Sequence, residues 1–240
     1  YPDYAVDWDA VRAAITPRTR LILVNTPHNP TGTVWSADDM RQLSAIVDGT
    51  DIVIVSDEVY EHILFDLRRH ESVLRYPELR RRAVVVSSFG KTFHTTGWKV
   101  GYCVAPPPLM TEVTRVHQFV TFTVHTPTQV AFAEFLMRDP EATALAGFYQ
   151  AKRDRFLSLT SGSRFVPLAC AGTYFQLLDY SAISQDADRA VAEWLLTTHG
   201  VAAIPVSAFL YRDTGGPVLR FCFAKKNQTL EAAAGRLSRV

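Results

Sequence analysis

The chain has 240 residues, of which 48% are hydrophobic and 20% are charged, and its formal net charge is +1. This length allows one large or two small domains, and the composition is that of an ordinary globular protein. The near-neutral charge gives no basis for a nucleic-acid partner or for binding to an anionic membrane. No apolar run reaches the roughly 20 residues of a membrane span, and no secretory signal opens the chain.

The apolar runs of the first part of the chain predict four strands, at residues 20–25, 51–56, 83–87 and 99–104. The first three are rich in Val, Ile and Leu and do not alternate, which is typical of parallel strands covered by helices on both faces. Between the first two, Ser36 and Asp39 form a capping-box-like helix start. Further helices are predicted at about 108–119 and 127–137. This part is therefore an α/β unit with a mostly parallel sheet.

After Asp139 the pattern changes to a helix over residues 140–159 followed by shorter elements. The predicted strands of this part are 164–168, 172–178, 201–205 and 217–223. Helices are predicted near 188–198 and from Asn227 onward. We expect a smaller α+β domain here, so that residues 1–150 belong to the large domain and residues 151–240 form the small one.

The three cysteines, Cys103, Cys170 and Cys222, lie in apolar, strand-like segments. Their odd number and the lack of a Cys-x-x-Cys pair indicate neither a disulfide framework nor a cysteine metal site. The seven histidines show no metal-binding spacing either, so no metal is predicted. Reduced thiols of this kind are typical of a cytoplasmic protein.

A lysine follows the third predicted strand, within Ser88-Phe89-Gly90-Lys91-Thr92. Gly90-Lys91-Thr92 is similar to the end of a phosphate-binding loop, but that loop needs a glycine five positions before Gly90, where the chain has Val85. A polar turn is the ordinary alternative. What remains of chemical interest is a lysine at the carboxyl end of a strand, where open α/β sheets bind their ligands.

Polar side chains also follow the other two central strands. Asn29 lies in the rigid turn Asn-Pro-Thr-Gly, and Asp57 directly follows the second strand, with Tyr60 three residues later. Each has an ordinary explanation: Asn29 as an Asx turn, Asp57 as a helix cap and Tyr60 as a core residue. Lys91 and Lys99 could equally be solvated lysines.

Taken together, these side chains meet the needs of one molecule, pyridoxal 5′-phosphate (PLP). Its aldehyde needs a lysine amine for a Schiff base, and its pyridine nitrogen needs a carboxylate that keeps it protonated. Its phenolic oxygen needs hydrogen-bond donors, and its phosphate needs cations and hydroxyls. These four roles fall, in order, to Lys91, to Asp57, to Asn29 with Tyr60, and to Ser88 with Lys99.

Asn-Pro-Thr-Gly at 29–32, Asp57-x-x-Tyr60, and Ser88-x-x-Lys91 followed by Lys99 resemble the class I aminotransferases of PLP fold type I. The order and approximate spacing match along the whole chain. Residues 26–32, 97–102 and 117–129 are most similar to the methionine and kynurenine aminotransferase branch. Many of its relatives have arginine where this chain has Lys99, and lysine supplies the phosphate charge without a bidentate fork.

The resemblance implies a PLP-dependent aminotransferase that moves an amino group from a methionine-like or aromatic L-amino acid to a 2-oxo acid. Lys91 would bind the cofactor and then serve as the general base, while Asp57 would stabilise the pyridinium and Tyr60 would assist. Arg220, within Leu219-Arg220-Phe221, matches the arginine that binds the substrate α-carboxylate. A structural salt bridge is the alternative for Arg220.

Two other functions stay open on the sequence. The same residues serve PLP-dependent β-lyases that act on cysteine conjugates, and a non-catalytic PLP-fold module would carry similar motifs. The resemblance also implies that the chain is the later part of a longer homodimeric protein. We then expect a long N-terminal portion with the glycine-rich phosphate loop, and an exposed apolar edge and face on the sheet of this chain.

Overall fold

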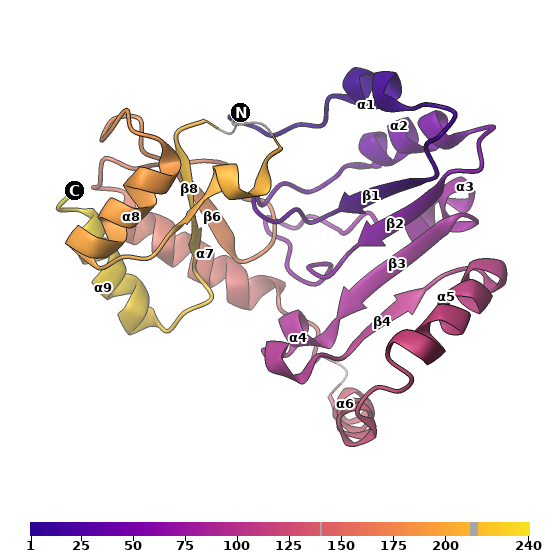
Figure 1. Ribbon diagram of the computed structural model, residues 1–240. Helices are drawn as coiled ribbons and strands as arrows, with labels where there is room; N and C mark the ends of the chain where they lie inside the picture. The colour runs from indigo at the N-terminus through magenta and orange to yellow at the C-terminus, as the bar shows by residue number, and fades with distance from the viewer. Residues whose placement is uncertain (140, 212–215) are drawn as a thin grey trace.

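The structure is a computed structural model that describes residues 1–139, 141–211 and 216–240. Its strands form two four-stranded sheets, with the orders β1-β2-β3-β4 and β5-β6-β8-β7. Figure 1 shows the first sheet on the right and the second on the left. The expected combination of an α/β sheet region with a smaller C-terminal α+β unit is confirmed.

The strands of the first sheet are β1 (Leu21–Asn25), β2 (Val53–Asp57), β3 (Ala83–Ser88) and β4 (Gly101–Val104). The first three are parallel, as predicted, whereas β4 runs antiparallel to β3. In this register Asn25 lies beside Asp57, and Ser88 lies beside Gly101. The carboxyl ends of the three parallel strands therefore meet at one edge of the sheet.

The helices on one face of this sheet are α1 (Trp8–Ala14), α2 (Ala37–Val47) and α3 (Pro77–Arg80), with the 3₁₀ turn η1 (Val73–Arg75). Helix α2 begins with the predicted capping box: the Ser36 hydroxyl accepts from the Asp39 N–H, and the Asp39 carboxylate accepts from the Ser36 N–H. It buries Met40, Leu43 and Val47 in the core beneath the sheet. This amphipathic packing holds the strand ends in place.

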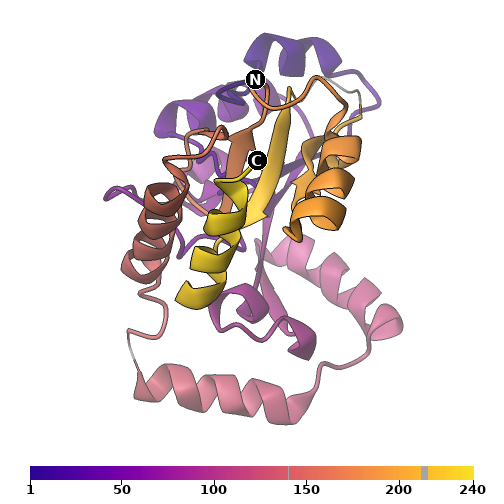
Figure 2. The same ribbon diagram turned by 90° about the vertical axis from the view of Figure 1, so that its left-hand side faces the viewer.

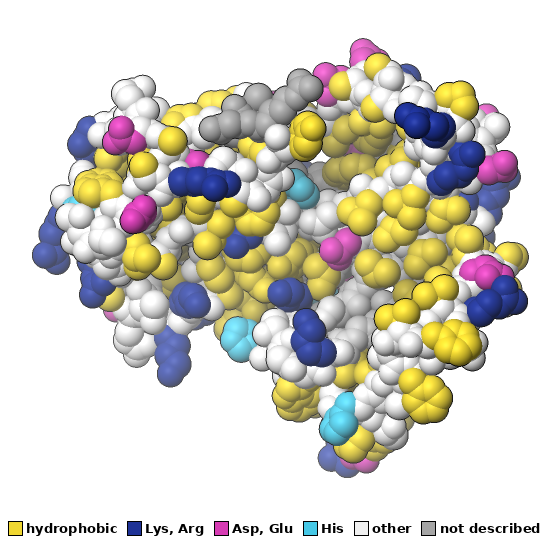
Figure 3. All heavy atoms as spheres, in the orientation of Figure 1, with side chains coloured by type: hydrophobic (Ala, Val, Ile, Leu, Met, Phe, Trp, Pro, Cys, Tyr) yellow, Lys and Arg dark blue, Asp and Glu magenta, His cyan; other side chains and the backbone are white. Residues whose placement is uncertain are grey.

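The opposite face of the sheet is largely uncovered by the described residues. Leu21 and Leu23 of β1 lie on this face and are 50% and 68% exposed. Helix α5 (Pro107–Val120) lies on this side but leaves Val116 and Phe119 in solvent, and α6 (Thr126–Arg138) crosses below the sheet (Figure 2). Figure 3 shows hydrophobic side chains gathered over the sheet. The expected exposed apolar face is present in this chain. Helices cover one face of the sheet well and the other poorly, whereas the strand pattern predicted cover on both faces.

The second sheet is antiparallel throughout and consists of β5 (Val166–Pro167), β6 (Phe175–Asp179), β7 (Ile204–Pro205) and β8 (Val218–Cys222). Its helices are α7 (Ala146–Thr160), α8 (Asp188–His199) and α9 (Asn227–Leu237), with the 3₁₀ turn η3 (Val206–Phe209). Helix α7 starts later than the predicted 140–159, and residue 140 lies outside the described residues. Asp139 bonds the Glu141 N–H through its side chain, which favours a turn over a helix there.

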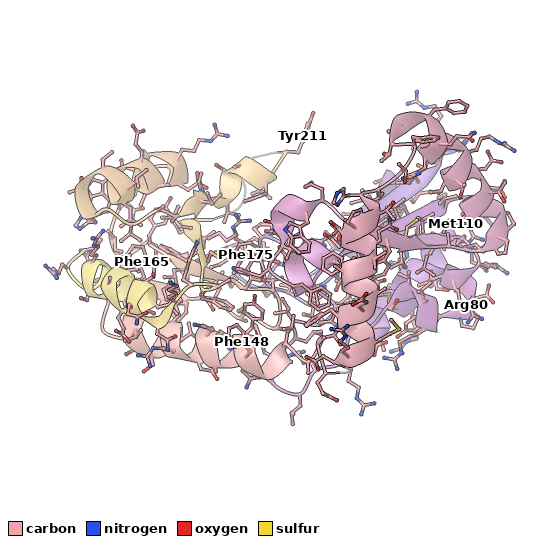
Figure 4. All side chains as sticks on the ribbon, turned by 90° about the horizontal axis from the view of Figure 1, so that it is seen from below. Arg80, Met110, Phe148, Phe165, Phe175 and Tyr211 are labelled. Atoms are coloured by element: carbon pink, nitrogen blue, oxygen red, sulfur yellow. The ribbon has the colours of Figure 1, made fainter. Side chains whose placement is uncertain are left out.

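The segment after β2 joins the two parts of the molecule. Tyr60, Ile63 and Phe65 belong to the hydrophobic core of the second sheet. Asp66 accepts two hydrogen bonds of 2.8 Å from Arg153 of α7. In Figure 4, Phe175 lies on the side of the second unit that faces the first sheet. The predicted boundary between residues 150 and 151 falls inside α7 and stays a prediction.

Candidate active site

Asp57, the last residue of β2, accepts hydrogen bonds through both its backbone carbonyl and its side-chain carboxylate. Its carbonyl accepts from the Thr26 N–H at 3.1 Å and from the Asn25 side chain at 2.9 Å. Its carboxylate accepts from the Val59 N–H at 3.1 Å. Burial raises the pKa of Asp57, while the Val59 hydrogen bond and the Lys91 charge act in the opposite direction. Asp57 thus caps the following turn, and its carboxylate lies within the electrostatic influence of Lys91 without an ion pair between them.

Lys91 lies on a one-turn helix, α4 (Phe89–Thr92), where the sequence indicated only a polar turn or loop. Ser88 begins this helix, because its hydroxyl accepts from the Gly90 N–H at 3.1 Å. Gly90 is closely packed, since an added Cβ would lie 3.0 Å from the Thr96 Cα. Within the described ranges the half-buried Lys91 amine has no hydrogen-bond or ion-pair partner. It is therefore free for chemistry at this edge of the sheet.

Lys99 precedes β4 and is exposed, with a left-handed backbone at φ 56°. The β3–β4 pairing brings this end of β4 beside Ser88, so Lys99 and Ser88 share one end of the sheet. The Ser88 hydroxyl is occupied in part, since it caps α4 and lies 3.4 Å from the Val100 carbonyl. A ligand at this edge would meet a hydroxyl and a cation that approach from adjacent strands.

Arg220 of β8 approaches from the second sheet. Its Nη1 donates to Asn29 Oδ1 at 2.5 Å, and its guanidinium lies 4.0 Å from the ring centroid of Phe175 and 4.8 Å from that of Phe209. Burial lowers the pKa of Arg220. No carboxylate pairs with it in the part of the chain that the structure describes. A structural salt bridge is therefore not what holds Arg220 in this structure.

Tyr60 is only 2% exposed and lies near enough to Asp57 and Arg220 for both charges to act on its hydroxyl. Its ring is 5.2 Å from that of Tyr174, and the two hydroxyls shift each other's pKa in opposite directions. Burial raises the pKa of Tyr60 most, Asp57 raises it further, and the Arg220 charge opposes this. Tyr60 is thus a core residue whose hydroxyl faces the site.

The sequence interpretation assigned no role to Asn25, Phe209 or Tyr174. Asn25 carried a signal, since it is the polar last residue of an otherwise apolar run. Phe209 is the last residue of η3. No group of three or more potential metal ligands occurs in the described ranges, and no helix among them is long and apolar enough to cross a membrane.

Comparison with known proteins identifies the family. The model of aminotransferase classes I and II matches residues 1–237, and the chain belongs to this family. Its fold is that of PLP fold type I aminotransferases. The chain is 51% identical, over its full length, to the methionine aminotransferase of Escherichia coli, of which it covers 62%. It is 34% identical to the kynurenine–oxoglutarate transaminase of Dictyostelium discoideum, with 99% of this chain and 60% of the relative covered.

The solved structures agree with this assignment. A methionine aminotransferase from Escherichia coli superimposes with a TM-score of 0.97 over all of this chain and 64% of that one. The N-succinyldiaminopimelate aminotransferase of Mycobacterium tuberculosis is 36% identical and has a TM-score of 0.93, with 63% of its chain covered. This chain thus spans somewhat less than two thirds of the length of these relatives.

Proposed function

We propose that this chain carries the cofactor and substrate residues of a PLP-dependent aminotransferase. The observation that carries the proposal is the partner-free Lys91 amine beside the half-buried Asp57 carboxylate, at the edge that Arg220 approaches. Partly burying an unpaired lysine and a carboxylate at a strand end destabilises the folded state when no ligand is bound. They have a purpose if a ligand completes them.

The donor set fits PLP. Asp57 has one carboxylate oxygen bonded to Val59 and would offer the other to the pyridine nitrogen. Asn29, whose Oδ1 accepts from Arg220, keeps its amide N–H groups for the phenolic oxygen, and Tyr60 would donate there too. Ser88 and Lys99 would bind the phosphate. When bound, PLP supplies an electrophilic carbon and an electron sink.

The chain's own residues would orient the substrate and move the proton. The Arg220 guanidinium would bind the α-carboxylate of the amino acid through two parallel hydrogen bonds. This would orient the Cα–H bond toward Lys91, whose amine would accept the proton and return it. The negative charge of Asp57 would keep the pyridine nitrogen protonated during this transfer.

We infer that the donor is a methionine-like or aromatic amino acid and that the acceptor is a 2-oxo acid. The 51% identity to a methionine aminotransferase supports this, as do the aromatic rings of Phe175, Phe209 and Tyr174 around Arg220 and Tyr60. We also propose a homodimer, which would cover exposed apolar residues such as Phe119. The three free thiols support a cytoplasmic location.

The test is a half-reaction with the full-length protein and PLP. Methionine added without an acceptor should convert the cofactor to its pyridoxamine form in one turnover, and the change in absorbance monitors this conversion. Aspartate should react far more slowly. Release of pyruvate and ammonia from cysteine conjugates, in place of this conversion, would show a β-lyase. A protein that never develops the absorbance of lysine-bound PLP would show a non-catalytic module, and either result would overturn the proposal.

A further inference from the structure

Asn25, which ends β1, joins two residues of the proposed cofactor site through one side chain. Its Nδ2 donates to the Asp57 carbonyl at 2.9 Å, and its Oδ1 accepts from the Asn29 backbone N–H, also at 2.9 Å. An amide offers a donor and an acceptor in one plane, and an aspartate or a serine could not make the same two bonds at this spacing. The contact therefore fixes where the 25–29 turn leaves the sheet relative to β2.

The rest of the turn is closed by other groups. The His28 N–H donates to the Thr33 carbonyl at 2.8 Å, and the Gly32 N–H donates to the His28 carbonyl at 2.8 Å. The hydroxyls of Thr31 and Thr33 lie 2.8 Å apart. These bonds shape the turn itself and do not reach Asp57. The Thr26 N–H also donates to the Asp57 carbonyl, at 3.1 Å, but it makes no contact with Asn29. The Asn25 side chain therefore has a separate task, because it bonds both Asp57 and Asn29.

From Asn29 the connection continues to the second sheet, because the Asn29 side chain accepts from Arg220 at 2.5 Å. We propose that Asn25 is a positioning residue that sets Asn29 relative to Asp57 and, through Asn29, orients Arg220. This inference rests on the proposed function, since Asn29, Asp57 and Arg220 act on one ligand only if the site binds PLP and an amino acid.

The test compares Asn25→Ala with Thr33→Val in the full-length protein. Thr33→Val removes a hydroxyl of the same turn that contacts Thr31 and keeps the side-chain shape. We expect Asn25→Ala to weaken PLP binding roughly tenfold and to raise the KM for methionine roughly tenfold, because two hydrogen bonds that hold the site are lost. Thr33→Val should change both by less than about threefold.

The double variant Asn25→Ala/Asn29→Ala shows whether Asn25 acts through Asn29. If it does, the KM for methionine in the double variant is no higher than in Asn29→Ala alone. Fully additive effects on KM, or equal effects of Asn25→Ala and Thr33→Val, would overturn the inference.

Hydrogen exchange of the peptide that covers residues 25–33, measured without PLP, separates this inference from the proposed function. Asn25→Ala should speed exchange of this peptide well beyond the effect of Thr33→Val, because the Asn29 amide loses its acceptor. If the parent protein binds no PLP but Asn25→Ala still speeds exchange, the proposed function is contradicted while the Asn25–Asn29 hydrogen bond is confirmed. Normal PLP binding with unchanged exchange would contradict the role of Asn25 alone.

Discussion

Arg220 Nη1 lies 2.5 Å from Asn29 Oδ1, although the two residues are 191 positions apart in the chain. Asn29 follows β1 of the first sheet, and Arg220 lies on β8 of the second. This contact is therefore where the proposed cofactor residues and the proposed substrate residue meet.

Arg220→Lys tests the substrate side of this contact. Lysine keeps the positive charge but cannot bind a carboxylate through a planar fork. We expect the KM for methionine to rise about 10- to 100-fold, the range of one charge-assisted hydrogen bond, with a smaller change in PLP affinity. Arg155→Lys is the matched control, because Arg155 forms an exposed ion pair with Glu231. An unchanged KM in Arg220→Lys would mean that the carboxylate binds elsewhere.

Asp57→Asn tests the cofactor side. The variant keeps the side-chain shape and an oxygen for the Val59 N–H, but it removes the charge proposed to hold the pyridine proton. We expect kcat to fall about 10- to 100-fold or more, with PLP affinity much less affected. Steady-state kinetics and a PLP titration measure the two effects. Near-normal kcat would leave Asp57 with its capping role only.

We expect the free energy of unfolding to decrease at acid pH because of Glu58. This 1% exposed carboxylate accepts from the Ser56 hydroxyl at 2.9 Å and from the Val73 N–H at 3.1 Å, and lies 2.7 Å from His70 Nε2. Although burial alone would raise its pKa, the His70 and serine hydrogen bonds lower it below its ordinary value. Because the pKa of Glu58 is lower in the folded than in the unfolded chain, its ionised form stabilises the fold fully above the unfolded pKa of about 4.3. This stabilisation is lost as the pH falls through the folded pKa.

His70→Ala leaves the Glu58 charge buried without its main partner. We expect the free energy of unfolding at pH 7 to fall by about 3 kcal/mol, measured by urea denaturation. Glu112→Gln, which removes an exposed ion pair with Arg115, should cost less than about 1 kcal/mol. Equal effects of the two variants would contradict the structural importance of the buried pair.

The exposed face of the first sheet predicts self-association of residues 1–240 expressed alone. Leu23 is 68% exposed in the middle of β1, and such apolar surfaces normally lie against another element or partner. Leu23→Lys should shift sedimentation toward the monomer, while Leu67→Lys, at a fully exposed loop residue, should not. A monomeric parent that binds no hydrophobic dye would show that this face is stable in water.

Much of the fold could be predicted because local patterns decide it. The Val- and Ile-rich runs gave the three parallel strands, and Ser36 with Asp39 gave the start of α2. The reversed direction of β4 was not predicted, since it depends on the short helix α4 and the 3₁₀ turn η2 (Thr96–Trp98) that follows it. The late start of α7 was also missed, because the Asp139 side chain competes with helical hydrogen bonding.

For the candidate site, the sequence indicated which residues carry chemistry but not how they touch. Strand ends and resemblance pointed to Asp57, Lys91 and Arg220, whereas the bridge made by Asn25 depends on the register of β1 against β2. Tyr174, directly before β6, brings its ring within 5.2 Å of that of Tyr60, which follows β2. Contacts of this kind follow from tertiary packing, and no local pattern encodes them.

Lys91 is the lysine that we propose to bind PLP. The full-length protein, loaded with PLP, is reduced with borohydride, digested, and mapped by mass spectrometry, which fixes the cofactor to whichever amine holds it. We expect the label to lie on the peptide that contains Lys91 and to disappear in Lys91→Ala. A label on Lys99 or on any other lysine, or no label at all, would contradict it.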